Sequence, residues 1–248
     1  MSNLRNYSHN ILLRLMADAD LALLAPGFTR VVLEPRQVLV TANMPIDQVY
    51  FLESGVASVV SRLPEQGMTE IGIFGREGFS GSAVMLGARS SPHYTHMQVD
   101  GQTALRIDSD RLLAAAAASP SLQAHLLRYV QSFLVQTAHT AVSNAHHRME
   151  ARLARWLLMC HDRLDGDEIQ ITHEFMAMMI AAQRSGVTIT LHFLEGAGMI
   201  RSQRGRVVIV DRARLEDISG EAYGQPEAEY RRLIGPFGRS AGAGDSDS

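Results

Sequence analysis

Lysine is absent from this sequence, and all 23 of its basic residues are arginine. The chain therefore has no lysine for a Schiff base or for a phosphate-binding P-loop. Cys160 is the only cysteine, which excludes an internal disulfide and a cluster held by four thiolates of one chain. Because Cys160 ends the apolar run Arg-Trp-Leu-Leu-Met-Cys, we expect a buried, inert thiol.

Long hydrophobic runs are also missing, since no stretch approaches the roughly 20 apolar residues of a membrane span. The first 26 residues interrupt their apolar positions with charges, which predicts an amphipathic helix rather than a signal peptide. We therefore expect a cytoplasmic protein that does not enter a membrane. Paired carboxylates, a nucleophile elbow and a phosphate-binding glycine loop are not found, so the sequence predicts no catalytic residues, no cofactor and no enzyme activity.

The sequence contains ten histidines, which are candidate metal ligands. His146 and His147 are adjacent on a predicted helix and diverge by about 100°, so they cannot readily share one ion. His125 and His139 are separated by about 21 Å along one helix. His93 and His96 lie in the first half of the chain. We interpret them as polar residues of the surface or of a pocket rather than as metal ligands. The sequence thus predicts no metal site.

Two halves with different patterns divide the 248 residues. Residues 28–107 contain short runs rich in β-branched residues, separated by Pro, Gly and Asn, which is typical of a small antiparallel barrel or jelly roll. From Asp108 the pattern is helical, and Pro120 is expected to open a long helix. The fold class is therefore α+β.

One face of this long helix carries apolar and small polar residues at spacings of three and four. They are Leu122, Leu126, Tyr129, Phe133, Thr137, Thr140 and Asn144. A narrow seam of this kind is what two helices need to pair side by side, so a dimerisation helix is favoured. The alternative is a helix that packs on its own barrel.

Two short helices with a tight connector follow in residues 172–195, and a hairpin comes after them. Thr172 can cap the first helix, Ala181 to Gln183 form the connector, and the second helix runs from about Arg184 to Glu195. This order predicts a helix-turn-helix with a wing.

Positive charge gathers on this segment, although the whole chain carries −3. From Gln183 to Arg214 there are six arginines and two acids, a local charge of +4. Local charge determines the attraction to DNA phosphates, so DNA contact is favoured over merely solubilising arginines. The predicted DNA-binding residues are Thr172, Gln183, Arg184, Ser185, Thr188, Arg201, Arg204 and Arg206.

Three stretches together resemble the Crp/Fnr family of bacterial transcription regulators. "ITHEFMAMMIAAQRSGVTITLHFLEGAGMIRSQRGRVVI" is similar to the family's winged helix-turn-helix, whereas "VYFLESGVASVV" and "GREGFSGSAVMLG" resemble landmarks of its sensory β-roll. The resemblance implies a cyclic-nucleotide-binding-like roll, a long dimerisation helix and a DNA-binding domain. It also implies a homodimer that binds a near-palindromic operator and acts on RNA polymerase.

The resemblance places an effector pocket at the second landmark and the following loop. Its expected residues are Phe79, Ser80, Gly81, Ser82, His93 and Tyr94. Nucleotide-binding members carry a glutamate where Ser82 stands, and an arginine that has no counterpart in Ser91–Tyr94. We therefore expect a roll that does not bind cyclic AMP, with an unidentified small molecule as the remaining effector. In the recognition helix, Ser185 and Ile189 also depart from residues common in the family.

The expected domains are the N-terminal helix and roll (1–118), the dimerisation helix (119–146), the winged helix-turn-helix (147–219) and a C-terminal extension (220–248) with a disordered end. The predicted function is sequence-specific DNA binding and transcription regulation. The alternative is a ligand-binding regulatory module whose helix-turn-helix docks a protein partner.

Overall fold

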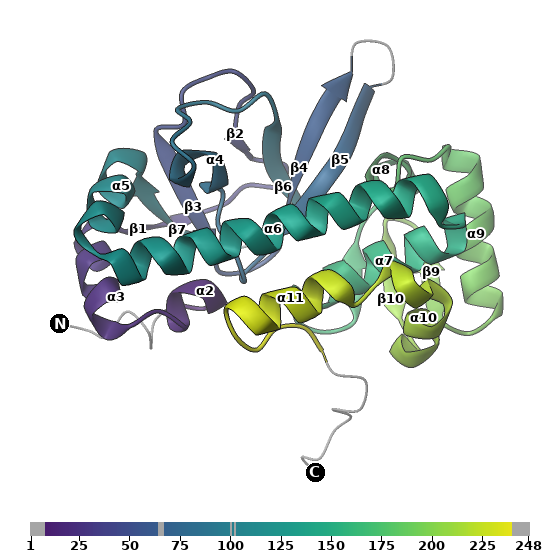
Figure 1. Cartoon of the computed structure of the whole chain (residues 1–248). Coiled ribbons are helices and arrows are strands. Elements are labelled where there is room, and N and C mark those ends of the chain that lie inside the picture. The colour runs from purple at the N-terminus through teal and green to yellow at the C-terminus, as the bar shows by residue number, and fades with distance from the viewer. Residues whose placement is uncertain (1–7, 64–66, 100, 102, 240–248) are drawn as a thin grey trace.

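The computed structural model describes residues 8–63, 67–99, 101 and 103–239. An antiparallel roll, a long helix and a C-terminal helix-turn-helix domain follow one another along the chain (Figure 1), which confirms the α+β prediction. The start of the predicted N-terminal helix and the C-terminal end expected to be disordered lie outside the described residues. No helix within the described ranges is long and apolar enough to cross a membrane.

Two antiparallel sheets form the roll, with strand orders β1-β7-β3 and β2-β6-β4-β5. The strands are β1 (Thr29–Val32), β2 (Val38–Val40), β3 (Gln48–Leu52), β4 (Val56–Leu63), β5 (Gly67–Phe74), β6 (Tyr94–Val99) and β7 (Thr103–Asp108). Burial alternates along β6, so one side of that strand faces the core. Residues from strands of both sheets belong to one buried apolar core.

Short helices close the roll. They are α2 (Ile11–Arg14), α3 (Asp18–Leu24), the 3-10 turn η1 (Ala25–Gly27), α4 (Ser82–Met85) and α5 (Ser109–Ala118). The single N-terminal helix that the sequence suggests is therefore divided into α2 and α3. Asn10 caps α2 by accepting from the Leu13 N–H at 3.0 Å, and Ala17 begins α3 in an extended conformation.

The long helix α6 (Pro120–His146) begins where the sequence predicts, with Pro120 in its first turn and Ser119 as N-cap. It lies across the open side of the roll (Figure 1). Tyr129 continues an aromatic stack from the roll, with ring centroids 5.0 Å apart between Phe51 and Phe79 and again between Phe79 and Tyr129. A side chain at Gly78 would meet the Tyr129 hydroxyl at 2.2 Å, so this close approach requires glycine.

The predicted dimer seam on α6 mostly faces the chain itself. Leu122, Leu126 and Tyr129 belong to the core of the roll, and Phe133 packs against that core. Further along, Thr140 is buried and accepts a hydrogen bond from Arg155 at 3.0 Å. The dimer assignment is therefore corrected for the first half of this face: the roll covers its four apolar residues, as in the alternative that the sequence left open, whereas Thr140 packs against the helix that contains Arg155. Thr137 and Asn144 remain half-buried at its edge.

A different face of α6 is left uncovered by the described part of the chain. Its residues are Ala124, Leu127, Gln131, Leu134, Ala138, Ala141 and Ala145. Their spacing alternates between three and four, as in the a and d positions of a heptad. All are exposed except the half-buried Leu127, and Leu134 is 50% exposed. We call this set the heptad face.

The C-terminal domain packs three helices against a small sheet of order β8-β10-β9 and continues into a fourth helix. Its elements are α7 (Met149–His161), β8 (Glu168–Gln170), α8 (His173–Met179), α9 (Arg184–Gly196), β9 (Ile200–Gln203), β10 (Arg206–Ile209) and α10 (Arg212–Ser219). Trp156 and Met176 are buried with Val187 and Leu191 in its core. Cys160 is buried there as predicted, and burial raises the pKa of its thiol well above the usual value.

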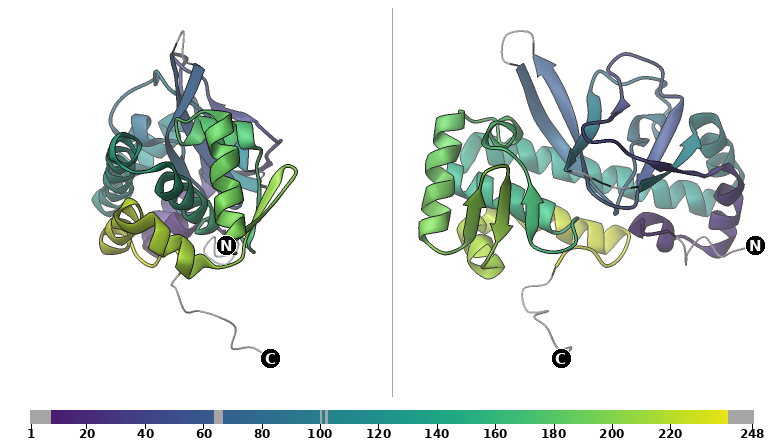
Figure 2. Two further views of the ribbon diagram at one scale, coloured as in Figure 1. Left: turned by 90° about the vertical axis from the view of Figure 1, so that its right-hand side faces the viewer. Right: turned by 180° about the vertical axis from the view of Figure 1, so that it is seen from behind.

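After a 3-10 turn, η2 (Gly220–Ala222), the chain forms α11 (Gln225–Leu233), which lies along α6 in both views (Figures 1 and 2). Its Tyr230 hydroxyl donates to the carbonyl of Glu77 in the roll at 2.8 Å. Beside it, the guanidinium of Arg163 and the carboxylate of Glu77 form a buried ion pair at 2.8 Å. The extension therefore ties the C-terminal domain to the roll.

Candidate nucleic-acid interface and effector pocket

The helix-turn-helix begins at Thr172, whose hydroxyl accepts from the Phe175 N–H at 3.3 Å, so the predicted N-cap of α8 is confirmed. Ala181 makes the turn between α8 and α9 with a φ of 49°, in the left-handed region that favours glycine. Gln183 is exposed and precedes α9 as its N-cap without a side-chain capping bond.

Helix α9 buries one face and exposes the other. Val187, Leu191 and Leu194 anchor it, whereas Arg184 and Ser185 in its first turn are exposed. No described residue forms an ion pair with Arg184. The α9 helix is exposed along its outer side (Figure 2, left), with the hairpin of β9 and β10 beside it. This arrangement leaves the first turn of α9 free to enter a groove.

Thr188 is less available than its neighbours. Its hydroxyl donates to the Arg184 carbonyl at 3.1 Å and lies 3.1 Å from Nδ1 of His173. Burial, then the nearby charge of Arg184, lowers the pKa of His173, so the neutral ring is favoured. The Thr188 hydroxyl can donate to another group only by giving up its bond to the Arg184 carbonyl, whereas one of its lone pairs can still accept.

The wing turns at Gly205, which has a φ of 77°. Arg201, Arg204 and Arg206 are all exposed on this hairpin. Arg206 is partly neutralised, because its guanidinium lies 3.1 Å from the Glu168 carboxylate. Arg201 and Arg204 have no acidic partner among the described residues. The wing thus presents two uncompensated positive charges and one compensated charge.

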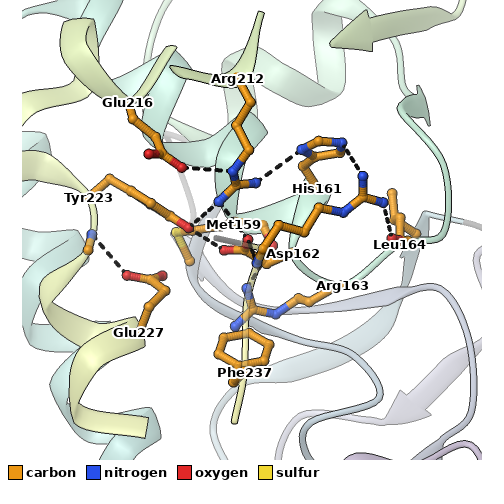
Figure 3. Close-up of polar contacts among 12 residues, drawn as sticks. Met159, His161, Asp162, Arg163, Leu164, Arg212, Glu216, Tyr223, Glu227 and Phe237 are labelled. Atoms are coloured by element: carbon orange, nitrogen blue, oxygen red, sulfur yellow. Dashed lines mark hydrogen bonds and ion pairs between the residues drawn. The ribbon is translucent and has the colours of Figure 1, made fainter. Parts of the chain in front are cut away.

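Two arginines that the sequence counted in the local charge bond within the domain, Arg212 to acids and the exposed Arg214 to a neutral carbonyl. Arg212 pairs with Asp162 at 2.8 Å and with Glu216 at 2.7 Å, inside the polar cluster of Figure 3. Arg214 donates to the carbonyl of Ala197 at 2.6 Å. The outward-facing positive charge is therefore smaller than the +4 counted from the sequence. The count included only residues 183–214, whereas the acids that form these ion pairs lie outside that segment.

Sequence reasoning missed one basic residue near this surface. Arg36, from the loop between β1 and β2, has its guanidinium carbon 4.9 Å from the centre of the Phe175 ring. With Thr172, Arg184 and Arg204 it lines one open hollow of about 500 Å³. Arg36 is distant in sequence from the helix-turn-helix, so no local pattern connects the two.

Two exposed apolar side chains add to the outer face of α9. Ile189 is 70% exposed and Phe193, one turn later, is 51% exposed. Apolar side chains indicate a contact surface when they form a contiguous exposed patch. They stand beside Ser185 on the same ridge of the helix, at spacings of four.

A second candidate site is a cavity of about 300 Å³ between the roll and α6. Of the expected effector residues, Phe79, Ser80, Ser82 and His93 line it. Gly81 and Tyr94 are not in the lining; Thr95, the inward-facing neighbour of Tyr94, is. The expected pocket residues include none from α6, which lines the cavity with Tyr129, Val130, Phe133, Leu134 and Thr137.

Comparison with known proteins agrees with this architecture. Residues 151–218 match the family model of the Crp-like helix-turn-helix domain. A "CRP-like cAMP-activated global transcriptional regulator" of Mycobacterium tuberculosis is 26% identical over 180 residues, which cover 69% of this chain and 79% of the relative.

Solved structures share the fold at low sequence identity. FixK2 from Bradyrhizobium japonicum superposes with a TM-score of 0.67 at 15% identity, over 79% of this chain and 99% of that one. The c-di-GMP responsive global regulator CLP of Xanthomonas campestris superposes with a TM-score of 0.62 at 16% identity, over 78% and 99%. The resemblance to Crp/Fnr-type transcription regulators is confirmed: the chain combines their fold with a Crp-like helix-turn-helix domain.

Proposed function

We propose that this chain is a sequence-specific DNA-binding regulator that acts as a homodimer on a near-palindromic operator. The observation that carries the proposal is the shared exposure of Arg184 and Ser185 on α9 with Arg201 and Arg204 on the wing. Arginine can bond two acceptors of guanine in the major groove, and wing arginines suit the flanking phosphates. Thr172 adds an exposed helix start, where a hydroxyl and backbone amides suit another phosphate.

The heptad face of α6 supports the homodimer. Leu127 and Leu134 supply apolar knobs, and the alanines at positions 138, 141 and 145 allow two helices to approach closely. Gln131 is a polar residue at a core position, a device that fixes the register of paired helices. Pairing two copies through this face would present two α9 helices to successive major grooves, about 34 Å apart.

Selection of genomic DNA tests the proposal. Purified full-length protein is incubated with sheared genomic fragments, and the bound fragments are sequenced. We expect enrichment of an inverted repeat whose half-sites are centred about 10 base pairs apart or a multiple of this. Recovery of random fragments only, at an ionic strength near 0.15 M, would contradict sequence-specific recognition.

A protein partner for the helix-turn-helix is the second candidate function, and the exposure of Ile189 and Phe193 favours it. Such a surface would bind through apolar contact and depend little on salt. DNA binding would weaken steeply as salt rises, because phosphate contacts release counterions. The dependence of binding on NaCl concentration therefore separates the two functions.

We also infer that the roll does not respond to cyclic AMP. Ser82, rather than an acid, stands in the cavity, and none of the described lining residues is arginine. A cyclic phosphate without its arginine loses a charge-assisted hydrogen bond worth about 1.5–3 kcal/mol. Titration of the protein with cyclic AMP up to millimolar concentration should leave operator affinity unchanged, and a clear gain in affinity would overturn this inference.

A further inference from the structure

The cavity between the roll and α6 is lined by apolar and uncharged polar side chains. Val59, Phe74 and Phe79 come from the roll, whereas Val130 and Phe133 come from α6. The polar side chains between them are uncharged hydroxyls and the ring of His93. Aspartate, glutamate and arginine do not occur among the described lining residues. An ionised ligand would therefore lose its hydration without gaining a counter-charge, which costs several kcal/mol.

Two polar atoms of the lining residues have no hydrogen-bond partner among the described residues, Nδ1 of His93 and the hydroxyl of Tyr129, and the Tyr129 hydroxyl packs against Gly78. Nδ1 of His93 is buried and makes no hydrogen bond with any described residue. Buried polar atoms nearly always have a partner, so an unpaired nitrogen in the wall of a cavity indicates a group that the cavity receives.

We propose that this cavity binds a neutral, mainly apolar small molecule that forms one hydrogen bond with His93. The volume of about 300 Å³ lies at the lower end of the range for small-molecule sites. Leu134 both lines the cavity and belongs to the heptad face, so a bound ligand can affect the pairing of two copies. This effect on dimerisation rests on the proposed function. Ligand binding itself does not depend on DNA, so the two proposals fail separately.

Displacement of a fluorescent probe tests the ligand class. N-phenyl-1-naphthylamine is bound to the full-length protein and displaced with 1-naphthamide or with 1-naphthoate, which share a ring system and differ in charge. We expect the neutral amide to displace the probe at a concentration about tenfold or more below that of the carboxylate. Equal displacement, a preference for the carboxylate, or displacement by cyclic AMP at the same concentration as the amide would overturn the proposal.

Filling the cavity tests its location. Ala83→Phe and Thr137→Phe enlarge side chains that line it from α4 and from α6, and each should abolish probe binding. The matched control Ala114→Phe, at an exposed position of α5, should bind the probe like the wild type. Full probe binding by both cavity variants would place the ligand elsewhere and contradict the proposal.

The role of His93 is tested with a substitution that keeps an aromatic ring. His93→Phe should lower the affinity for 1-naphthamide about 2- to 10-fold, the loss of one hydrogen bond, and leave the affinity for 1-methylnaphthalene unchanged. If both affinities fall together, His93 only shapes the cavity and the hydrogen bond is refuted. The His93→Phe comparison and the naphthamide–naphthoate comparison do not use the cavity-filling variants. They therefore test the proposal even if Ala83→Phe and Thr137→Phe do not fold.

Discussion

Replacement of Arg184 by alanine is the most direct perturbation of the proposed DNA-reading surface. Arg184 is exposed in the first turn of α9 and has no acidic partner among the described residues. A bidentate contact with guanine discriminates by about 1–3 kcal/mol, so Arg184→Ala should weaken operator binding about 5- to 150-fold. Stability should change by less than about 0.5 kcal/mol, because the side chain is on the surface and a cation near a helix N-terminus is slightly unfavourable.

Fluorescence anisotropy with the selected operator and with a scrambled duplex measures this effect. Operator affinity should fall much more than affinity for the scrambled duplex, and sedimentation should still show the same oligomeric state. Arg14→Ala, which removes an exposed arginine from α2 in the roll, is the matched control and should bind both duplexes like the wild type. If Arg184→Ala kept its preference for the operator, the assignment of α9 as the base-reading element would be refuted.

Three further predictions concern the heptad face and two buried acids. In the proposed dimer Leu134→Glu places like charges opposite each other, so sedimentation should show dissociation. The control Ala114→Glu, at an exposed position of α5, should not dissociate the dimer. If Leu134→Glu dimerised as strongly as the wild type, the heptad face would be ruled out as the interface. Burial raises the pKa of Glu70 to about 8, above its ordinary value of 4.5, so the protonated form is favoured in the folded state and unfolding free energy should fall as pH rises from about 5 to 8. Glu70→Gln should remove most of that fall in urea unfolding, and an unchanged pH profile would show that Glu70 is not its source. Arg163→Ala leaves Glu77 buried without its partner at 2.8 Å and should cost about 3–5 kcal/mol in urea unfolding; a loss under about 1 kcal/mol would mean that water reaches Glu77.

The helix-turn-helix and its wing could be predicted from sequence because their signals are local. Thr172 caps the helix that follows it, and Gly205 adopts the left-handed turn between two short strands. Pro120 likewise begins α6 at the expected residue. Each of these features depends on only a few neighbouring residues, so the sequence contains what determines it.

The features that sequence reasoning missed depend on contacts between distant segments. Helix α6 carries two apolar stripes, and only the folded chain shows that the roll covers Leu126 and Tyr129 and leaves Leu134 exposed. Arg212 appears free in sequence, yet it pairs with Asp162 from the end of α7 (Figure 3). The cavity likewise depends on distant segments, since its lining residues come from both the roll and α6.

The salt dependence of operator binding tests the central claim most directly. In the proposed dimer each protomer offers the uncompensated Arg201 and Arg204 to the phosphates, so the pair makes about four such contacts. Between 50 mM and 200 mM NaCl, contacts of that number weaken binding about 10²-fold, with a linear relation between the logarithms of affinity and salt concentration. The account predicts this steep slope for the wild-type protein on its selected operator. A slope near zero would contradict it and favour a protein partner for the helix-turn-helix.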